Sequence, residues 1–185
     1  EPMDEAHPKN PTTTYAAGKA AADNAVESYG HMFDQDIYIV RPFNNYGPRQ
    51  NYKGHLAGIV PITAWRLLNN MAPELHGTGT QSRDFIYIND TVDAIIKLHG
   101  VIPAGESVNI STNNQISVAD LLYKICNEMN YSGEMVRKPG RNSDVLCHNA
   151  CNKKIQTIID YSLTPFDEGL RKTLSWYQEK IKGSN

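Results

Sequence analysis

Short β-branched strands alternate with helical segments along this chain, and this alternation constrains the fold more than any other feature. The first pair is an alanine-rich helix, expected from Thr12 to about Tyr29, followed by the apolar run Asp36–Val40. This run is typical of a buried parallel strand, and Pro42 would end its hydrogen-bond ladder. Because parallel strands are joined by helical crossovers, the alternation predicts an α/β fold with mainly parallel pairing.

The later segments continue the same order. The asparagines, glycine and prolines after Pro42 predict a loop, Pro61 is expected in the first turn of a helix, and Asn89–Asp90 are expected to cap another. Gly77-Thr78-Gly79 predicts a turn between two strands. The predicted strands are Glu74–His76, Asp84–Ile88, Ser107–Ile110 and Met135–Arg137, and the predicted helices are Leu56–Asn69, 89–99, Ser117–Met129, Lys153–Ile159 and Asp167–Ile181.

Length and charge limit the classes of function. At 185 residues the chain suffices for one domain with a core but is short for a two-domain enzyme. Glu1–Glu5 read as the middle of a loop, so we expect that more chain precedes them. The net charge of -2 gives no reason to expect nucleic acid or an anionic membrane as a partner. No run approaches the ~20 apolar residues of a membrane span, and no secretion signal opens the sequence.

The cysteines and histidines indicate neither a disulfide framework nor a metal centre. Cys126, Cys147 and Cys151 are odd in number and lack paired ligand spacing, which favours a reduced protein of the cytoplasm. The histidines share no metal-ligand spacing, so no metal is expected. Five of them are expected to be solvated or to cap helices, namely His31, His55, His76, His99 and His148.

Tyr15-Ala16-Ala17-Gly18-Lys19 places a phenol and an ammonium four residues apart on the first predicted helix. Residues with this spacing lie one turn apart on the same face. A nearby positive charge favours the phenolate, which is the form in which tyrosine acts as a general base. The alternative for Tyr15 is an ordinary, half-buried helix aromatic.

Four further motifs follow the Tyr15–Lys19 motif in order. Together the five motifs resemble those of the extended short-chain dehydrogenase/reductase family, specifically its NAD-dependent nucleotide-sugar epimerases, 4,6-dehydratases and decarboxylases. The resemblance covers essentially the whole chain. The motifs are Asn10-Pro11 with Tyr15–Lys19, Arg41-Pro42-Phe43-Asn44-Asn45-Tyr46-Gly47-Pro48-Arg49-Gln50, Ile59-Val60-Pro61, His76–Asp90, and Pro139-Gly140-Arg141-Asn142-Ser143-Asp144.

The resemblance implies the C-terminal part of a Rossmann-type doubly wound parallel sheet plus a smaller α/β substrate-binding domain. Residues 1–50 and 84–100 would be the remnant of the NAD-binding domain, and residues 51–83 and 101–185 would bind the nucleotide sugar. The glycine-rich turn that receives the dinucleotide pyrophosphate in such folds has no counterpart in this sequence.

The resemblance also assigns the catalytic and cofactor-binding residues. Tyr15 would act as general base or acid on a sugar hydroxyl, and Lys19 would stabilise its phenolate while bonding the nicotinamide ribose. Pro42 would be a further cofactor contact.

Two substrate-binding residues come from the same resemblance. Asn44 matches the asparagine that contacts a substrate phosphate, with a simple turn residue as the alternative. Val60 matches the position whose backbone meets the uracil or thymine ring, with a core valine as the alternative.

Charged residues would hold the rest of the nucleotide. Arg83 and Arg141 match the arginines that hold the diphosphate, a task suited to a forked cation. Their alternative is a surface salt bridge with Asp84 or Asp144. Asp144 matches the acid that bonds the ribose hydroxyls, although Ser143 stands where the family usually has glycine.

The preferred function is a UDP-glucose 4-epimerase-like enzyme that uses NAD to oxidise a sugar hydroxyl to a keto intermediate through the Tyr/Lys pair. The alternatives are a dTDP-glucose-type 4,6-dehydratase, a UDP-glucuronate decarboxylase, and a non-catalytic nucleotide-sugar-binding or sensing module. The substrate would be a UDP- or dTDP-hexose, and the chain alone is expected to be inactive. Small residues around the Tyr15 helix favour close helix packing and a homodimer of the full-length protein.

Overall fold

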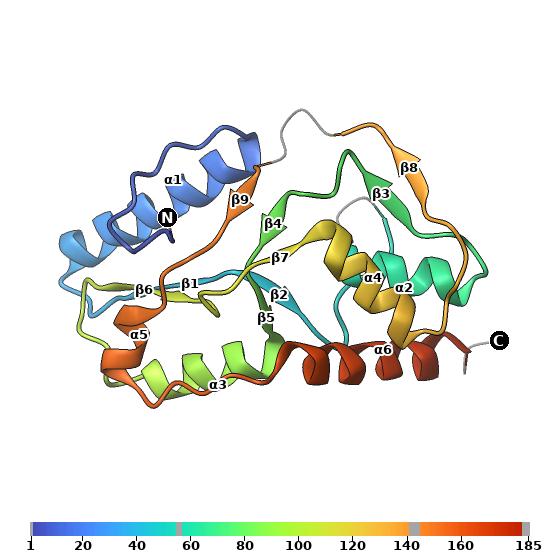
Figure 1. Cartoon of the computed structure of the whole chain (residues 1–185). Helices are drawn as coiled ribbons and strands as arrows, with labels where there is room; N and C mark the ends of the chain where they lie inside the picture. Colours follow the sequence, from blue (N-terminus) through green and yellow to red (C-terminus); the bar gives the residue numbers. More distant parts are fainter. Residues whose placement is uncertain (1, 55–56, 141–144, 183–185) are drawn as a thin grey trace.

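The computed structural model describes residues 2–54, 57–140 and 145–182 of the chain (Figure 1). The helices are α1 (Thr14–Phe33), α2 (Ile59–Leu68), α3 (Ile88–Leu98), α4 (Val118–Glu128), α5 (Lys153–Ile158) and α6 (Phe166–Lys182). The strands are β1 (Ile39–Pro42), β2 (Asn44–Tyr46), β3 (Glu74–His76), β4 (Ser82–Arg83), β5 (Phe85–Tyr87), β6 (Ser107–Ile110), β7 (Ile116–Ser117), β8 (Val136–Lys138) and β9 (Cys147–His148).

Most strands in the described residues pair in parallel, which confirms the α/β prediction. β1 pairs with β6, β2 with β5 and β3 with β8, all in parallel. β4 lies between β7, which is antiparallel to it, and β9, which is parallel. In Figure 1, α1 lies on one side of the β1–β6 pair, whereas α3 and α5 lie on the other. Helices on both faces of a parallel sheet are the arrangement of doubly wound folds.

The chain changes its strand partner at Phe43. β1 ends with Pro42 opposite Ile110, and the Phe43 N–H still donates to the Ile110 carbonyl at 3.0 Å. One residue later, the Asn44 N–H donates to the Asp84 carbonyl at 3.2 Å, and β2 begins against β5. Two sheets therefore meet where the predicted phosphate-binding asparagine lies.

The loop prediction is thus wrong over Asn44–Tyr46. Tyr46 is buried, and its ring packs against Tyr87 with the centroids 5.7 Å apart. This burial of an aromatic residue against the neighbouring strand outweighs the preference of the asparagines for turns.

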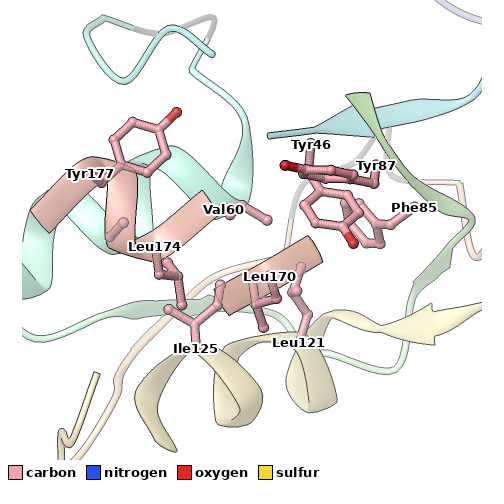
Figure 2. Close-up of a cluster of buried hydrophobic side chains, with 10 residues drawn as sticks. Tyr46, Val60, Phe85, Tyr87, Leu121, Ile125, Leu170, Leu174 and Tyr177 are labelled. Atoms are coloured by element: carbon pink, nitrogen blue, oxygen red, sulfur yellow. The ribbon is translucent and has the colours of Figure 1, made fainter. Parts of the chain in front are cut away.

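Two clusters of buried side chains form the core. The first, drawn in Figure 2, joins β2 and β5 to α2, α4 and α6. The second joins β5 and α3 to β6 and α5. Side chains of a strand point alternately to opposite faces, so Phe85 and Tyr87 enter the first cluster and Ile86 the second. β5 therefore holds the two halves of the structure together.

Helix α1 continues past its predicted end at Tyr29. Gly30 lies inside the helix, and a Cβ atom there would lie only 2.6 Å from Cδ1 of Ile37. The helix ends at Asp34, which takes the left-handed conformation at φ 50°. Gly30 therefore serves the close approach of Ile37, and Asp34 takes the cap position predicted for the glycine.

The predicted cap of α3 is also wrong. The helix begins at Ile88 with Tyr87 as N-cap, so Asn89 and Asp90 lie in its first turn. The Asp90 carboxylate instead accepts the Thr164 N–H at 2.8 Å and the Thr164 hydroxyl at 2.7 Å. Asp90 thereby fixes the segment that leads into α6.

The other predicted elements lie near their expected positions. Pro61 is in the first turn of α2, and Gly77 and Gly79 turn the chain at φ 65° and 77°. The two-residue strands β4, β7 and β9 are absent from the sequence prediction, because two residues carry no periodicity. Across the described ranges, no helix combines the length and apolar character that membrane spanning requires.

Candidate active site

Tyr15, Lys19 and Asp23 form one row along α1. Residues spaced by four lie on the same face of a helix, each one turn beyond the last. The Asp23 carboxylate at the end of this row is bound by Arg41 of β1, whose Nε and Nη2 both lie 3.0 Å from Asp23 Oδ2. The face that carries the phenol and the ammonium is therefore anchored to the strand that ends at Pro42.

The predicted cofactor-site residues lie at the surface. Tyr15 is 77% exposed, and Lys19 and Pro42 are exposed as well. Within the described ranges, no hydrogen bond joins the Tyr15 hydroxyl to the Lys19 ammonium. Tyr15 is therefore not a half-buried aromatic with a packing role. The Tyr15 hydroxyl is accessible to a ligand.

Asn44 is fixed at the junction of the two sheets. Its Nδ2 donates to the Asp84 carbonyl at 2.9 Å and lies 3.4 Å from Nδ1 of His148. Because a carbonyl oxygen only accepts, the contact with Asp84 identifies the nitrogen end of the amide. Long-range contacts hold this side chain, so Asn44 is more than a simple turn residue.

Asp84 is fully buried between β4 and β5. Its Oδ1 accepts the Thr112 N–H at 2.9 Å and the Thr112 hydroxyl at 2.6 Å, and its Oδ2 accepts the Asn113 N–H at 3.1 Å. Burial raises the pKa of the carboxyl, and these hydrogen bonds oppose the rise. Asp84 thereby holds the segment after β6 against the junction that carries Asn44.

Arg83 lies next to this group. In the β4–β9 register it is directly opposite His148. Its Nη1 donates to the carbonyl of Ser82 at 2.8 Å and to that of Val145 at 2.6 Å. The predicted substrate residues Asn44 and Arg83 therefore both lie next to His148.

His148 is not among the predicted site residues. From the sequence it is expected to be solvated or to cap a helix. The structure shows it partly buried, with its ring stacked on Phe43 at a centroid distance of 4.9 Å and an interplanar angle of 28°. Burial, and secondarily the positive charge of Arg83, lowers the pKa of His148, whereas Asp84 opposes this. Its separation from Asn44 in the sequence leaves no local signal of the contact.

Val60 has a side chain that belongs to the core. It is 1% exposed within the cluster of Figure 2, in the first turn of α2. The side chain of Val60 is therefore that of a core valine, which is the alternative to a substrate contact. The 1% exposure covers the whole residue, so the contact of the Val60 backbone with a base stays a prediction.

Arg141 and Asp144, predicted to bind the diphosphate and the ribose, lie outside the described residues, as does Ser143. Among the described residues, no three His, Cys, Asp or Glu side chains gather as a set of metal ligands.

Comparison with known proteins identifies the family of the chain. Residues 1–111 match the model of the NAD dependent epimerase/dehydratase family. The chain is 33% identical to a dTDP-D-glucose 4,6-dehydratase of Bos taurus, over 97% of the chain and 51% of that protein. It is 29% identical to a UDP-glucose 4-epimerase of Mycolicibacterium smegmatis, over 97% of the chain and 57% of that protein. The chain thus spans about half the length of the curated relatives it matches.

Solved structures give the same result. A UDP-glucose 4-epimerase from Thermotoga maritima, crystallised with UDP-glucose, superimposes with a TM-score of 0.92 at 26% identity, over 97% of this chain and 58% of the other. A UDP-glucose 4-epimerase of Thermus thermophilus in complex with NAD gives 0.88 at 26% identity, over 96% and 58%. These neighbours confirm the predicted Rossmann-type α/β fold. With the family model matched over residues 1–111, they show that this chain belongs to the NAD-dependent epimerase/dehydratase family.

Proposed function

We propose that the chain is the C-terminal, substrate-binding part of an NAD-dependent nucleotide-sugar epimerase of the UDP-glucose 4-epimerase type. The anchored row on α1 carries this proposal. It presents the Tyr15 phenol and the Lys19 ammonium on one accessible face, and the Asp23–Arg41 pair fixes that face to the strand leading to Asn44. Catalysis by a phenol requires this combination of exposure and fixed position.

The surface residues fit the nicotinamide end of NAD. Lys19 is exposed and has N–H donors for ribose hydroxyls, and Pro42 is exposed at the end of a strand, where α/β folds bind ligands. NAD, when bound, supplies an acceptor for a hydride from the sugar carbon. The sequence has no glycine-rich turn for the pyrophosphate, so this chain would contribute only the nicotinamide side of the cofactor site.

In this proposal Tyr15 holds and moves one proton. Its phenolate takes the proton of the sugar hydroxyl as that carbon is oxidised to a ketone. The Lys19 ammonium, one turn away, stabilises the negative oxygen before the transfer. Tyr15 returns the proton when the ketone is reduced, and reduction from the opposite face of the ring yields the epimer.

The substrate would lie across the junction of the two sheets. Asn44 and the forked Arg83 cation would hold the diphosphate, and the first turn of α2 at Val60 would meet the base. Arg141 and Asp144 complete the proposed site as ligands of the diphosphate and the ribose. The substrate is proposed to be a UDP- or dTDP-hexose.

The division into domains remains part of the proposal. Residues 1–50 and 84–100 are assigned to the NAD-binding part, and residues 51–83 and 101–185 to the substrate-binding part. The pairing of β1 with β6 joins Ile39–Pro42 of the first part to Ser107–Ile110 of the second.

A dTDP-glucose 4,6-dehydratase is the second candidate, because a relative with this name is 33% identical to the chain. A UDP-glucuronate decarboxylase would share the same ketone stage. A non-catalytic sensor would not need an exposed phenol with an ammonium on the same helix face, and Tyr15 with Lys19 therefore weighs against this class.

The test is to incubate the complete enzyme with NAD and either UDP-glucose or dTDP-glucose, and to follow the sugar by NMR. We expect the galactose epimer from UDP-glucose. A 4-keto-6-deoxy product from dTDP-glucose would favour the dehydratase. Binding of the nucleotide sugar without a product would favour the sensor.

We also propose a homodimer and a cytoplasmic location for the full-length protein. Helix α1, which lies wholly within the described range, has no buried residue and exposes Tyr29, Met32 and Phe33. Light scattering that gives only the monomer mass would reject the dimer. The three cysteines are unpaired in the described residues, which agrees with a reducing compartment.

A further inference from the structure

His148 contacts or faces three groups at the proposed diphosphate site. Its ring stacks on Phe43, its backbone lies opposite Arg83, and its Nδ1 lies 3.4 Å from Nδ2 of Asn44. The proposed function gives this imidazole no role. Its position suggests that it controls the amide of Asn44.

Both hydrogens of the Asn44 amide have acceptors in this structure. One goes to the Asp84 carbonyl at 2.9 Å and the other to His148 Nδ1 at 3.4 Å. Because the amide nitrogen only donates, Nδ1 accepts, and the imidazole is neutral with its proton on Nε2. Phosphate oxygens also only accept, so Asn44 can bind a diphosphate only by releasing one of these contacts. The contact with His148 is the longer and therefore the weaker of the two.

Burial, and secondarily the charge of Arg83, favours the neutral form of His148 in the free protein. Among the described residues, Arg83 on β4 and Asp84 next to it are the charged groups that influence the imidazole, while Phe43 and Asn44 are uncharged. Burial and Arg83 lower the pKa of His148 against the opposing effect of Asp84. A diphosphate bound at Arg83 would add negative charge nearby and would favour the imidazolium.

We propose that His148 is a positioning residue that couples binding of the diphosphate to uptake of one proton. The neutral ring holds the Asn44 amide. When Nδ1 takes a proton from solvent, the ring no longer accepts, the amide turns to the diphosphate, and the imidazolium adds a positive charge beside it. The proton returns to solvent when the nucleotide leaves. This inference rests on the proposed function for the site of binding, but the His148–Asn44 coupling itself does not.

The coupling is tested in the free enzyme by NMR with labelled histidine and asparagine. We expect the side-chain amide signal of Asn44 to shift with the same midpoint as the His148 imidazole. In His148→Gln this titration disappears, while the amide oxygen of glutamine still accepts from Asn44. An Asn44 signal that stays constant while His148 titrates would overturn the inference without reference to any substrate.

The link between diphosphate binding and proton uptake is tested by calorimetry with UDP-glucose and dTDP-glucose. The titrations are run between pH 5.5 and 8, in two buffers of different ionisation enthalpy. These diphosphate diesters do not titrate near neutrality, whereas the terminal phosphate of a free nucleoside diphosphate, with a second pKa of about 6, does. We expect uptake of up to one proton and a Kd that falls as pH falls, by at most about tenfold per pH unit. His148→Gln should remove both effects.

His99→Gln is the matched control, because His99 is an exposed histidine whose Nδ1 lies 3.2 Å from the Tyr38 hydroxyl. It should bind with the pH dependence of the natural protein. If a nucleotide sugar binds and His148→Gln retains that pH dependence, the inference is wrong and the proposed function stands. If neither nucleotide sugar binds at any pH, the proposed function fails and the linkage fails with it.

Discussion

Arg41 binds Asp23 through two guanidinium nitrogens, each 3.0 Å from the same carboxylate oxygen. The third nitrogen, Nη1, donates to the Glu5 carbonyl at 3.3 Å. One side chain thus joins β1, helix α1 and the N-terminal segment. The two partners are only 23% and 20% exposed, so solvent screens the pair less than it screens a surface ion pair. Its importance lies in fixing the helix that carries Tyr15.

Replacing Arg41 with lysine should loosen α1, because lysine keeps the charge but loses the fork. We expect the free energy of opening α1 to fall by about 1 kcal/mol, so that its amides exchange about fivefold faster. Hydrogen exchange measures this, and the rate of the enzyme should fall with it. Arg171→Lys is the control, since that guanidinium is 61% exposed and lies 3.5 Å from Glu128. Equal exchange of α1 in both variants would contradict the anchoring role.

Tyr15→Phe should remove catalysis and leave the fold intact. The variant lacks only the hydroxyl of a side chain that is 77% exposed, so its melting temperature should not change. Loss of the proton-transfer group should cost on the order of a hundredfold in kcat or more. Tyr29→Phe controls for the loss of a phenol on the same helix, because Tyr29 is 57% exposed. Comparable activity in the two variants would remove Tyr15 from the mechanism.

Asp84→Asn should destabilise the fold, although it changes the shape of the side chain very little. One carboxylate oxygen accepts both Thr112 donors and the other accepts the Asn113 N–H. An asparagine has one carbonyl oxygen, so its NH₂ group would face a donor in a fully buried site. We expect a loss of about 1–3 kcal/mol in the free energy of unfolding, measured by urea denaturation. Unchanged stability would mean that these hydrogen bonds contribute nothing.

Replacing each of two glycines of α1 with alanine should change the stability of the protein by different amounts. A Cβ atom on Gly18 meets nothing within 4 Å, so Gly18→Ala should stabilise the protein by about 0.5–1 kcal/mol through helix propensity. A Cβ atom on Gly30 would lie 2.6 Å from both Cδ1 and Cγ1 of Ile37. Gly30→Ala should therefore be the less stable variant by about 1 kcal/mol or more in thermal unfolding. Equal stabilisation would show that Ile37 moves aside freely.

Local patterns in the sequence predict the helices and the row on α1, because each depends on residues within a few turns. The parallel pairing is predicted instead by the alternation of strands with helical crossovers along the chain. They do not predict β2, since Tyr46 becomes buried only against the neighbouring strand. They also misplace Asp90, whose carboxylate binds Thr164 across 74 residues of sequence. The contact of His148 with Asn44 spans 104 residues, and no spacing indicates it. The sequence therefore allows candidate residues such as Tyr15 and Asn44 to be named singly, but it does not indicate the contacts that join Asn44 to His148.

The pH dependence of stability provides a separate check on His148. Its pKa in the folded protein is lowered, chiefly by burial and then by Arg83, whereas an unfolded histidine titrates near ~6.5. Below about 6.5 the unfolded chain therefore takes up a proton that the folded imidazole does not, until the pH reaches the folded pKa. Stability should fall with decreasing pH across that window, with a slope from this group of at most about 1.4 kcal/mol per pH unit.

Urea denaturation at several pH values measures this slope, and His148→Gln should reduce it where His99→Gln does not. His99 is exposed, so it controls for the removal of an imidazole as such. The same slope in both variants would show that the folded protein does not disfavour the charged form of His148. Because the neutral ring is what holds the Asn44 amide, that result would also weaken the proposed link between proton uptake and binding.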